Sequence, residues 1–224
     1  MNAVKVTSKY LFNEIPDDEK KIDKFGYKAC KISLAKKWQF VVPETVFLSG
    51  DLVKEIFEKK KIPTEILSHL KNKLIAIRPS PVADQFKKNG SFLYIGLDDQ
   101  SFDTLKHSVG VKNALEIYLS FLRMFALTVY NLDLENCDEL KGLLESLKSP
   151  EATFVESSLC KIGRIKQLIS LETGFNFPKN TSEQLVEVIN SIYKKWISPT
   201  QRILRDVSGR KSDELIPVFL QEMH

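Results

Sequence analysis

The side chains best suited to catalysis, cysteine and histidine, are few and scattered in this sequence. The three cysteines, Cys30, Cys137 and Cys160, are far apart and form no CxxC pair, so neither a zinc site nor a disulfide framework is indicated. His69 and His107 lie in polar, helix-like surroundings, and the third histidine ends the chain. None has the serine, cysteine or carboxylate pattern of a catalytic triad.

Two adjacent carboxylates and several isolated cations are the remaining candidates. Asp98 and Asp99 could bind a metal, but a turn between a strand and a helix is the more common use of this sequence. A lysine can offer phosphate a point charge, and an arginine a planar fork that grips two oxygens. A lysine near a glycine and an arginine that ends a strand are, however, usually surface residues. Residue type alone therefore defines no site, and the elements that position these side chains must be considered.

Composition favours a globular protein. The chain has 224 residues, 43% hydrophobic and 28% charged, which is enough to form a core. The net charge of +4 comes from basic residues spread among acidic ones, and no nucleic-acid-binding motif accompanies them. No window approaches the roughly 18 apolar residues of a membrane span, and the N-terminus lacks the apolar run of a signal peptide. We therefore expect a cytoplasmic protein with no nucleic-acid or membrane partner.

The first half of the chain has the patterns of both helices and strands. Helices are predicted over residues 27–37 and 51–60 and from Pro63 onward, with Ser49 or Asp51 as a cap. Strands are predicted over residues 37–43, 44–48, 73–78 and 92–96.

The second half is mainly helical. Helices are predicted over residues 113–131, 138–147, 157–172 and 181–196. A late strand is predicted over 215–221, where Pro217 would require an edge or a bulge. Since this strand needs partners from before residue 100, we expect an α+β fold with a helical block inserted into it or packed beside it. The predicted division is 1–110, 111–205 and 206–224, the last returning to the first.

Four segments, taken in order along essentially the whole chain, resemble one enzyme family. The most specific is residues 171–185, LETGFNFPKNTSEQL, which is similar to a pattern of ETG, FP and EQL. Residues 76–80 match a strand that ends in arginine followed by small residues, and 96–99 resemble GLND. Residues 25–29 occupy the place of GGKGA. This order and spacing resemble the start of pyruvate phosphate dikinase, with phosphoenolpyruvate synthase a more distant fit.

The resemblance implies an incomplete ATP-grasp-like fold, in which ATP lies between two α+β subdomains. The family uses ATP and inorganic phosphate to phosphorylate a histidine on a swivelling domain, which carries the phosphoryl group to pyruvate. The implied partners are ATP and the downstream phosphohistidine and pyruvate-binding domains. The ligands for Mg²⁺ are expected beyond the end of this chain, which would be a fragment and inactive alone.

The resemblance also implies a site. Lys28 and Arg78 match the family's phosphate contacts, with Arg78 in the catalytic role, while Gly90 and Ser91 belong to the loop that covers the phosphates. We expect Lys28 and Arg78 to converge on one cleft. No residue is assigned to a metal.

Several positions depart from the family pattern. Lys87 replaces a glycine of the covering loop, Tyr27 and Ala29 stand where GGKGA has glycines, and Leu119 and Ser120 replace paired arginines. These changes leave a second hypothesis open, in which the chain is a non-catalytic homologue that serves as an interaction module. A third, an unrelated regulator, would require the 171–185 match to be coincidental.

Overall fold

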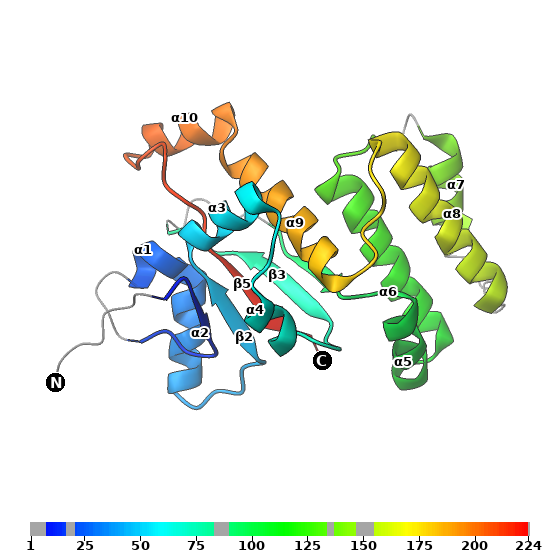
Figure 1. Ribbon diagram of the computed structural model, residues 1–224, viewed down its shortest axis with the longest axis horizontal. Helices are drawn as coiled ribbons and strands as arrows, with labels where there is room; N and C mark the ends of the chain where they lie inside the picture. The colour runs from blue at the N-terminus through cyan, green and yellow to red at the C-terminus, as the bar shows by residue number, and fades with distance from the viewer. Residues whose placement is uncertain (1–7, 17–20, 83–89, 134–136, 147–154, 224) are drawn as a thin grey trace. The chain divides into compact units, whose positions relative to one another are not determined.

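A computed structural model describes residues 8–16, 21–82, 90–133, 137–146 and 155–223 (Figure 1). The chain forms two compact units. Unit 1 comprises Met1–Phe92 and Val188–His224, and unit 2 is Leu93–Glu187. In the described part of the chain, ten α-helices and a five-stranded sheet confirm a mixed α+β fold.

The sheet has the strand order β1-β2-β5-β3-β4. Its strands are β1 (Tyr10–Phe12), β2 (Thr45–Leu48), β3 (Ile75–Pro79), β4 (Phe92–Ile95) and β5 (Val218–Glu222). The late strand β5 pairs antiparallel with both β2 and β3, and Figure 1 shows it in red between them. The expectation that it would pair with strands from before residue 100 is therefore confirmed.

The expectation that Pro217 would require an edge strand or a bulge is wrong. Pro217 lies one residue before β5, so its missing N–H removes no hydrogen bond from that strand. Its carbonyl instead accepts a hydrogen bond from the Ser80 N–H at 2.9 Å. A proline at the entrance of a central strand is therefore tolerated here.

Unit 1 contains five helices and the end of a sixth. They are α1 (Lys21–Phe25), α2 (Tyr27–Lys37), α3 (Gly50–Lys59), α4 (Thr64–His69), α10 (Pro199–Val207) and the end of α9 (Thr181–Trp196). The predicted cap of α3 is Ser49, whose hydroxyl accepts from the Leu52 N–H at 3.3 Å. Residues that pair across β1, β2 and β5 point Leu11, Phe47 and Phe219 to one face of the sheet. That face packs against α1 and α2 through a core of Ile15, Phe25, Ala29, Phe47 and Phe219.

The strand predicted over residues 37–43 does not form. Helix α2 runs through Lys37, and Gln39 then takes a left-handed conformation at φ 64° that ends the helix. The Phe40 N–H donates back to the Ala35 carbonyl at 3.1 Å, which folds the segment onto the last turn of α2. The aromatic and β-branched composition indicated a strand, but Trp38 and Val41 are 65% and 102% exposed and pack into no sheet.

Unit 2 is helical. It contains α5 (Asp99–Val109), α6 (Val111–Met124), the π-helical turn η2 (Phe125–Val129), α7 (Asp138–Ser146), α8 (Val155–Thr173) and the start of α9. The helix predicted over 113–131 is thus α6 continued by a π-turn. Its buried aromatic residues surround Phe177, which is 5.2 Å from Phe125 and 6.1 Å from Phe121 between ring centroids. None of the helices described is long and apolar enough to cross a membrane.

Candidate functional site

Lys28 lies in the first turn of α2, directly after a glycine with an unusual backbone conformation. Gly26, the N-cap, has φ 79° and ψ 166°, a region that is essentially restricted to glycine. A Cβ at this position would lie 1.5 Å from the carbonyl oxygen of Ser80. Only glycine therefore allows the turn that carries Lys28 to approach the chain after β3 so closely.

Two hydrogen bonds hold these segments together. The Ala29 N–H donates to the Ser80 hydroxyl at 3.0 Å, and the Tyr27 N–H donates to the Pro81 carbonyl at 3.3 Å. Ser80 is fully buried. The residues after β3 therefore cap the N-terminus of α2, a long-range equivalent of the side-chain caps found at helix ends.

Arg78 lies on β3, on the sheet face that α2 covers in part. It pairs with Phe219 across β3 and β5, so both side chains point to the face that carries the α1 and α2 core. Arg78 itself is exposed. Because Ser80 follows Arg78 by two residues and binds the turn of Lys28, the structure places Lys28 and Arg78 on the same side of the sheet in unit 1.

Of the predicted covering loop, only its end lies within the described residues. Residues 83–89, including Lys87, are outside them. Gly90 and Ser91 are exposed and lie just before β4. Apart from its chain neighbours, no atom of the described residues lies within 4 Å of the Cβ that a larger residue would carry at Gly90, and its φ is not in the left-handed region. Neither backbone conformation nor close packing therefore requires glycine at this position.

The departures from the family's glycines have structural consequences. Ala29 is fully buried in the core of unit 1, and the Lys31 ammonium lies 4.3 Å from the centroid of the Tyr27 ring. The N–H groups of both Tyr27 and Ala29 are already bonded to protein oxygens. The side chains of Lys28 and Arg78 suit phosphate, but these two amides of the α2 N-terminus are not open to it.

A metal would need a different arrangement. Among the described residues, no group of three or more His, Cys, Asp or Glu side chains lies together as a metal site would require.

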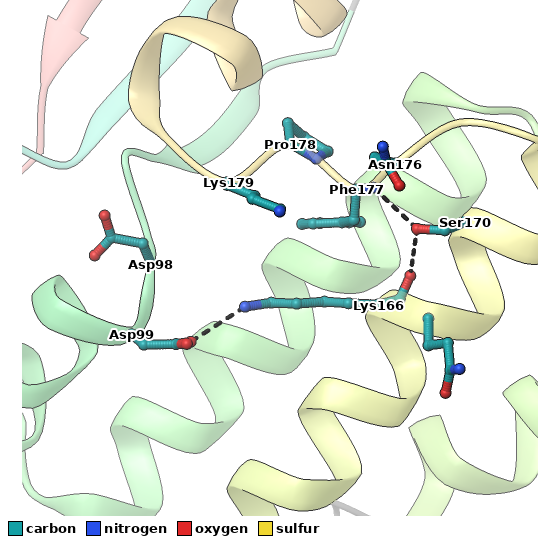
Figure 2. Close-up of a pocket in the computed structure, with 9 residues that line it drawn as sticks. Asp98, Asp99, Lys166, Ser170, Asn176, Phe177, Pro178 and Lys179 are labelled. Carbon is teal, nitrogen blue, oxygen red and sulfur yellow. Dashed lines mark hydrogen bonds and ion pairs between the residues drawn. The ribbon is translucent and has the colours of Figure 1, made fainter.

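Unit 2 contains a pocket of about 500 Å³ that sequence reasoning missed (Figure 2). Its walls come from the start of α5, the end of α8 and the connection that leads to α9. They are formed by Asp98, Asp99, Lys166, Gln167, Ser170, Asn176, Phe177, Pro178 and Lys179. Asp98, Asp99, Phe177 and Pro178 fall in segments used for the family resemblance, but no local signal indicated that Lys166 and Lys179 would join them.

Lys166 and Asp99 form an ion pair in this pocket. Lys166 donates to Asp99 at 3.1 Å, and the Tyr118 hydroxyl donates to the same carboxylate oxygen at 3.0 Å. Partial desolvation by neighbouring groups opposes ionisation of the largely exposed Asp99, but the charge and hydrogen bond of Lys166 and the bond from Tyr118 outweigh it and lower its pKa. Burial, together with the neighbouring Asp99 carboxylate, raises the pKa of Tyr118. Tyr118 therefore remains a neutral donor at physiological pH.

Buried and part-buried hydrogen bonds fix the segments that surround the pocket. The Ser170 hydroxyl accepts from the Phe177 N–H at 2.9 Å and donates to the Lys166 carbonyl at 2.9 Å. The buried Gln184 side chain accepts from the Gly96 N–H at 2.7 Å and donates to the Leu97 carbonyl at 3.0 Å. Two segments of the family resemblance, 96–99 and 171–185, are therefore joined by a side chain that bonds on both sides.

The fold and the motifs together define a class of relatives. The chain is a mixed α+β protein whose motifs, taken in order, resemble the amino-terminal region of the pyruvate phosphate dikinases. It is 26% identical over 159 residues to the pyruvate, phosphate dikinase of Giardia intestinalis. The match covers 67% of this chain and 17% of that relative. No family model matches the chain. The resemblance is therefore confirmed at the level of the family, and the match spans less than a fifth of the length of that relative.

Proposed function

We propose that unit 1 binds the phosphate groups of ATP as part of a pyruvate phosphate dikinase-like phosphotransferase. Lys28 and Arg78 are the proposed phosphate contacts, with Gly90 and Ser91 beside the nucleotide. The observation that carries this proposal is the 3.0 Å hydrogen bond between the Ala29 N–H and the Ser80 hydroxyl. It fixes the turn of Lys28 to the chain two residues beyond Arg78.

The chemistry of phosphoryl transfer explains why two cations would matter. Negative charge on the phosphoryl oxygens is stabilised mainly by positioned cations, and an arginine can hold two oxygens at once. Arg78 is exposed on β3, and Lys28 is half-buried in the first turn of α2. In the proposed reaction Arg78 would stabilise the charge of the transferred group. Phosphohistidine and pyruvate-binding regions, and the ligands of Mg²⁺, would be supplied outside this chain.

Calorimetric titration with MgATP tests the proposal. Lys28→Ala and Arg78→Ala should each weaken binding about tenfold or more, the usual effect of losing a hydrogen bond to a charged group. Arg78→Lys should recover part of the loss, because it keeps the charge without the fork. Lys36→Ala is the matched control, since it removes the same charge about 12 Å further along α2. Equal affinity of all four variants and the unchanged chain would refute the assignment.

A second candidate function is an interaction module that no longer binds nucleotide. It is favoured by the engaged N–H groups of Tyr27 and Ala29, which a phosphate-binding helix end would leave free. Thermal unfolding separates the two functions. Saturating MgATP should raise the melting temperature by several degrees if unit 1 binds nucleotide, and should leave it unchanged if the chain is only a module.

A further inference from the structure

The pocket of unit 2 has no part in the function proposed above, yet its charges are arranged for a ligand. We propose that it binds a small organic anion, whose carboxylate or phosphate group is held between the ammonium groups of Lys166 and Lys179. Carboxylates and phosphate monoesters share this chemistry, since both present oxygen acceptors on a compact negative group.

The first argument is the balance of charge inside the pocket. Figure 2 shows Lys166 and Lys179 reaching into it from two sides, with the Phe177 ring beside both. Asp99 points toward Lys166, while Asp98 is turned away and caps α5 by accepting from the Ser101 N–H at 2.8 Å. Lys166 is thus paired with Asp99, while the Asp98 carboxylate is engaged at the helix cap. Within the described residues, the Lys179 ammonium has no hydrogen-bonding or ionic partner.

The second argument is that Lys166 can be shared. The Asp99 side chain is 80% exposed, so its ion pair with Lys166 is screened by solvent and weak. A lysine ammonium has three donors, and Asp99 occupies one of them. The Tyr118 ring, whose centroid lies 5.1 Å from the ammonium, keeps Lys166 in place without using a donor. A ligand can therefore bind Lys166 without first displacing Asp99.

The third argument is the shape of the site. A volume of about 500 Å³ falls in the usual range for small-molecule pockets. Phe177 is 6% exposed and Pro178 is buried, so the wall beside the lysines is apolar and rigid. The hydrogen bond between the Phe177 N–H and the Ser170 hydroxyl fixes that wall to α8. A small apolar body attached to the anionic group would lie against this wall.

Nuclear magnetic resonance titration of the full chain tests the proposal with three probes of similar size. Benzoate carries a carboxylate, phenyl phosphate a phosphate, and benzyl alcohol neither. We expect benzoate, phenyl phosphate or both to shift the amide signals of Lys166, Ser170, Phe177 and Lys179 with a Kd of roughly millimolar or below. Whichever anion binds more tightly identifies the source. Absence of these shifts with both anions, or equal shifts with benzyl alcohol, would overturn the proposal.

Two substitutions with opposite expected effects sharpen the test. Lys179→Gln should raise the Kd of the anion about tenfold, because one hydrogen bond to a charged group is lost. Asp99→Asn should lower the Kd of the anion several-fold. The competing charge beside Lys166 disappears, while the amide oxygen still accepts a hydrogen bond from Tyr118. Lys112→Gln, an exposed lysine of the same unit, is the matched control and should change nothing. A loss of affinity in Asp99→Asn would show that the residue acts only as part of the framework, and would also overturn the proposal.

Discussion

Replacing Gly26 by alanine should destabilise unit 1 severely, because two separate costs add at this position. The conformation at φ 79° and ψ 166° costs a non-glycine residue about 1–3 kcal/mol. The new Cβ would also lie 1.5 Å from the Ser80 carbonyl oxygen, a backbone atom that cannot rotate away. Separating the segments would break the bonds from Tyr27 and Ala29, each worth about 1 kcal/mol. The expected loss in the free energy of unfolding is roughly 3–5 kcal/mol.

Urea denaturation of three variants separates these costs. Gly209 has φ 69° and no atom within 4 Å of an added Cβ, so Gly209→Ala should show the conformational strain alone, about 1 kcal/mol. Gly90 has neither a left-handed φ nor a close neighbour among the described residues. Gly90→Ala should therefore change the free energy of unfolding by less than about 0.5 kcal/mol. If Gly26→Ala lowers the free energy of unfolding by no more than Gly209→Ala does, the close approach of Gly26 to Ser80 does not contribute to the stability of the turn that carries Lys28.

Three further predictions concern buried or paired polar groups. Ser80→Ala should cost about 1–2 kcal/mol in urea denaturation, because the buried N–H of Ala29 loses its acceptor. Arg205→Met should cost about 2–4 kcal/mol in the same assay, since the 1% exposed guanidinium bonds two backbone carbonyls that would be left unsatisfied. Hydrogen bonding and charge from Lys73 lower the pKa of Glu44, so its ionised form stabilises the fold above the ordinary value of 4.5. That contribution should be lost as pH falls through the lowered pKa, and Glu44→Gln should flatten the acid limb of a stability profile.

Local signals in the sequence located most helices and strands. The bounds predicted for α2, residues 27–37, are those observed, and the helix predicted over 157–172 is α8, which ends at Thr173. Helix α9 begins at Thr181 and ends at Trp196, as its apolar spacing predicted. These successes have one cause, since caps, glycines and apolar periodicity act over a few residues and are readable without a structure.

The failures come from interactions that are distant in the sequence. Residues 37–43 have the composition of a strand, but a strand also needs a neighbour to pair with, and composition cannot supply one. The pocket of unit 2 depends on Asp99 and Lys166, which are 67 positions apart. Lys166 has the helical spacing of an ordinary surface lysine, so only the fold reveals its role.

The prediction of the candidate site had a different basis. Lys28 and Arg78 were selected by resemblance, and their separate elements were predicted from local patterns. What brought them to one face was the pairing of β3 with β5, whose two strands are more than 100 positions apart in the chain. The tight contact of Gly26 with Ser80 could not be predicted, because it depends on a backbone conformation that the sequence does not specify.

The segments that resemble the dikinases most closely contribute to the stability of the fold. The resemblance at these segments is therefore weak evidence for nucleotide binding. Gln184, in the EQL motif, is 1% exposed and bonds the backbone at Gly96, in the motif similar to GLND. A relative that had lost nucleotide binding would still need this bond to hold its helical unit together. Similarity at these positions therefore supports a shared fold, whether or not ATP binds. Lys28 and Arg78 are the proposed phosphate contacts, so their substitution is the test that separates a phosphate-binding protein from a module.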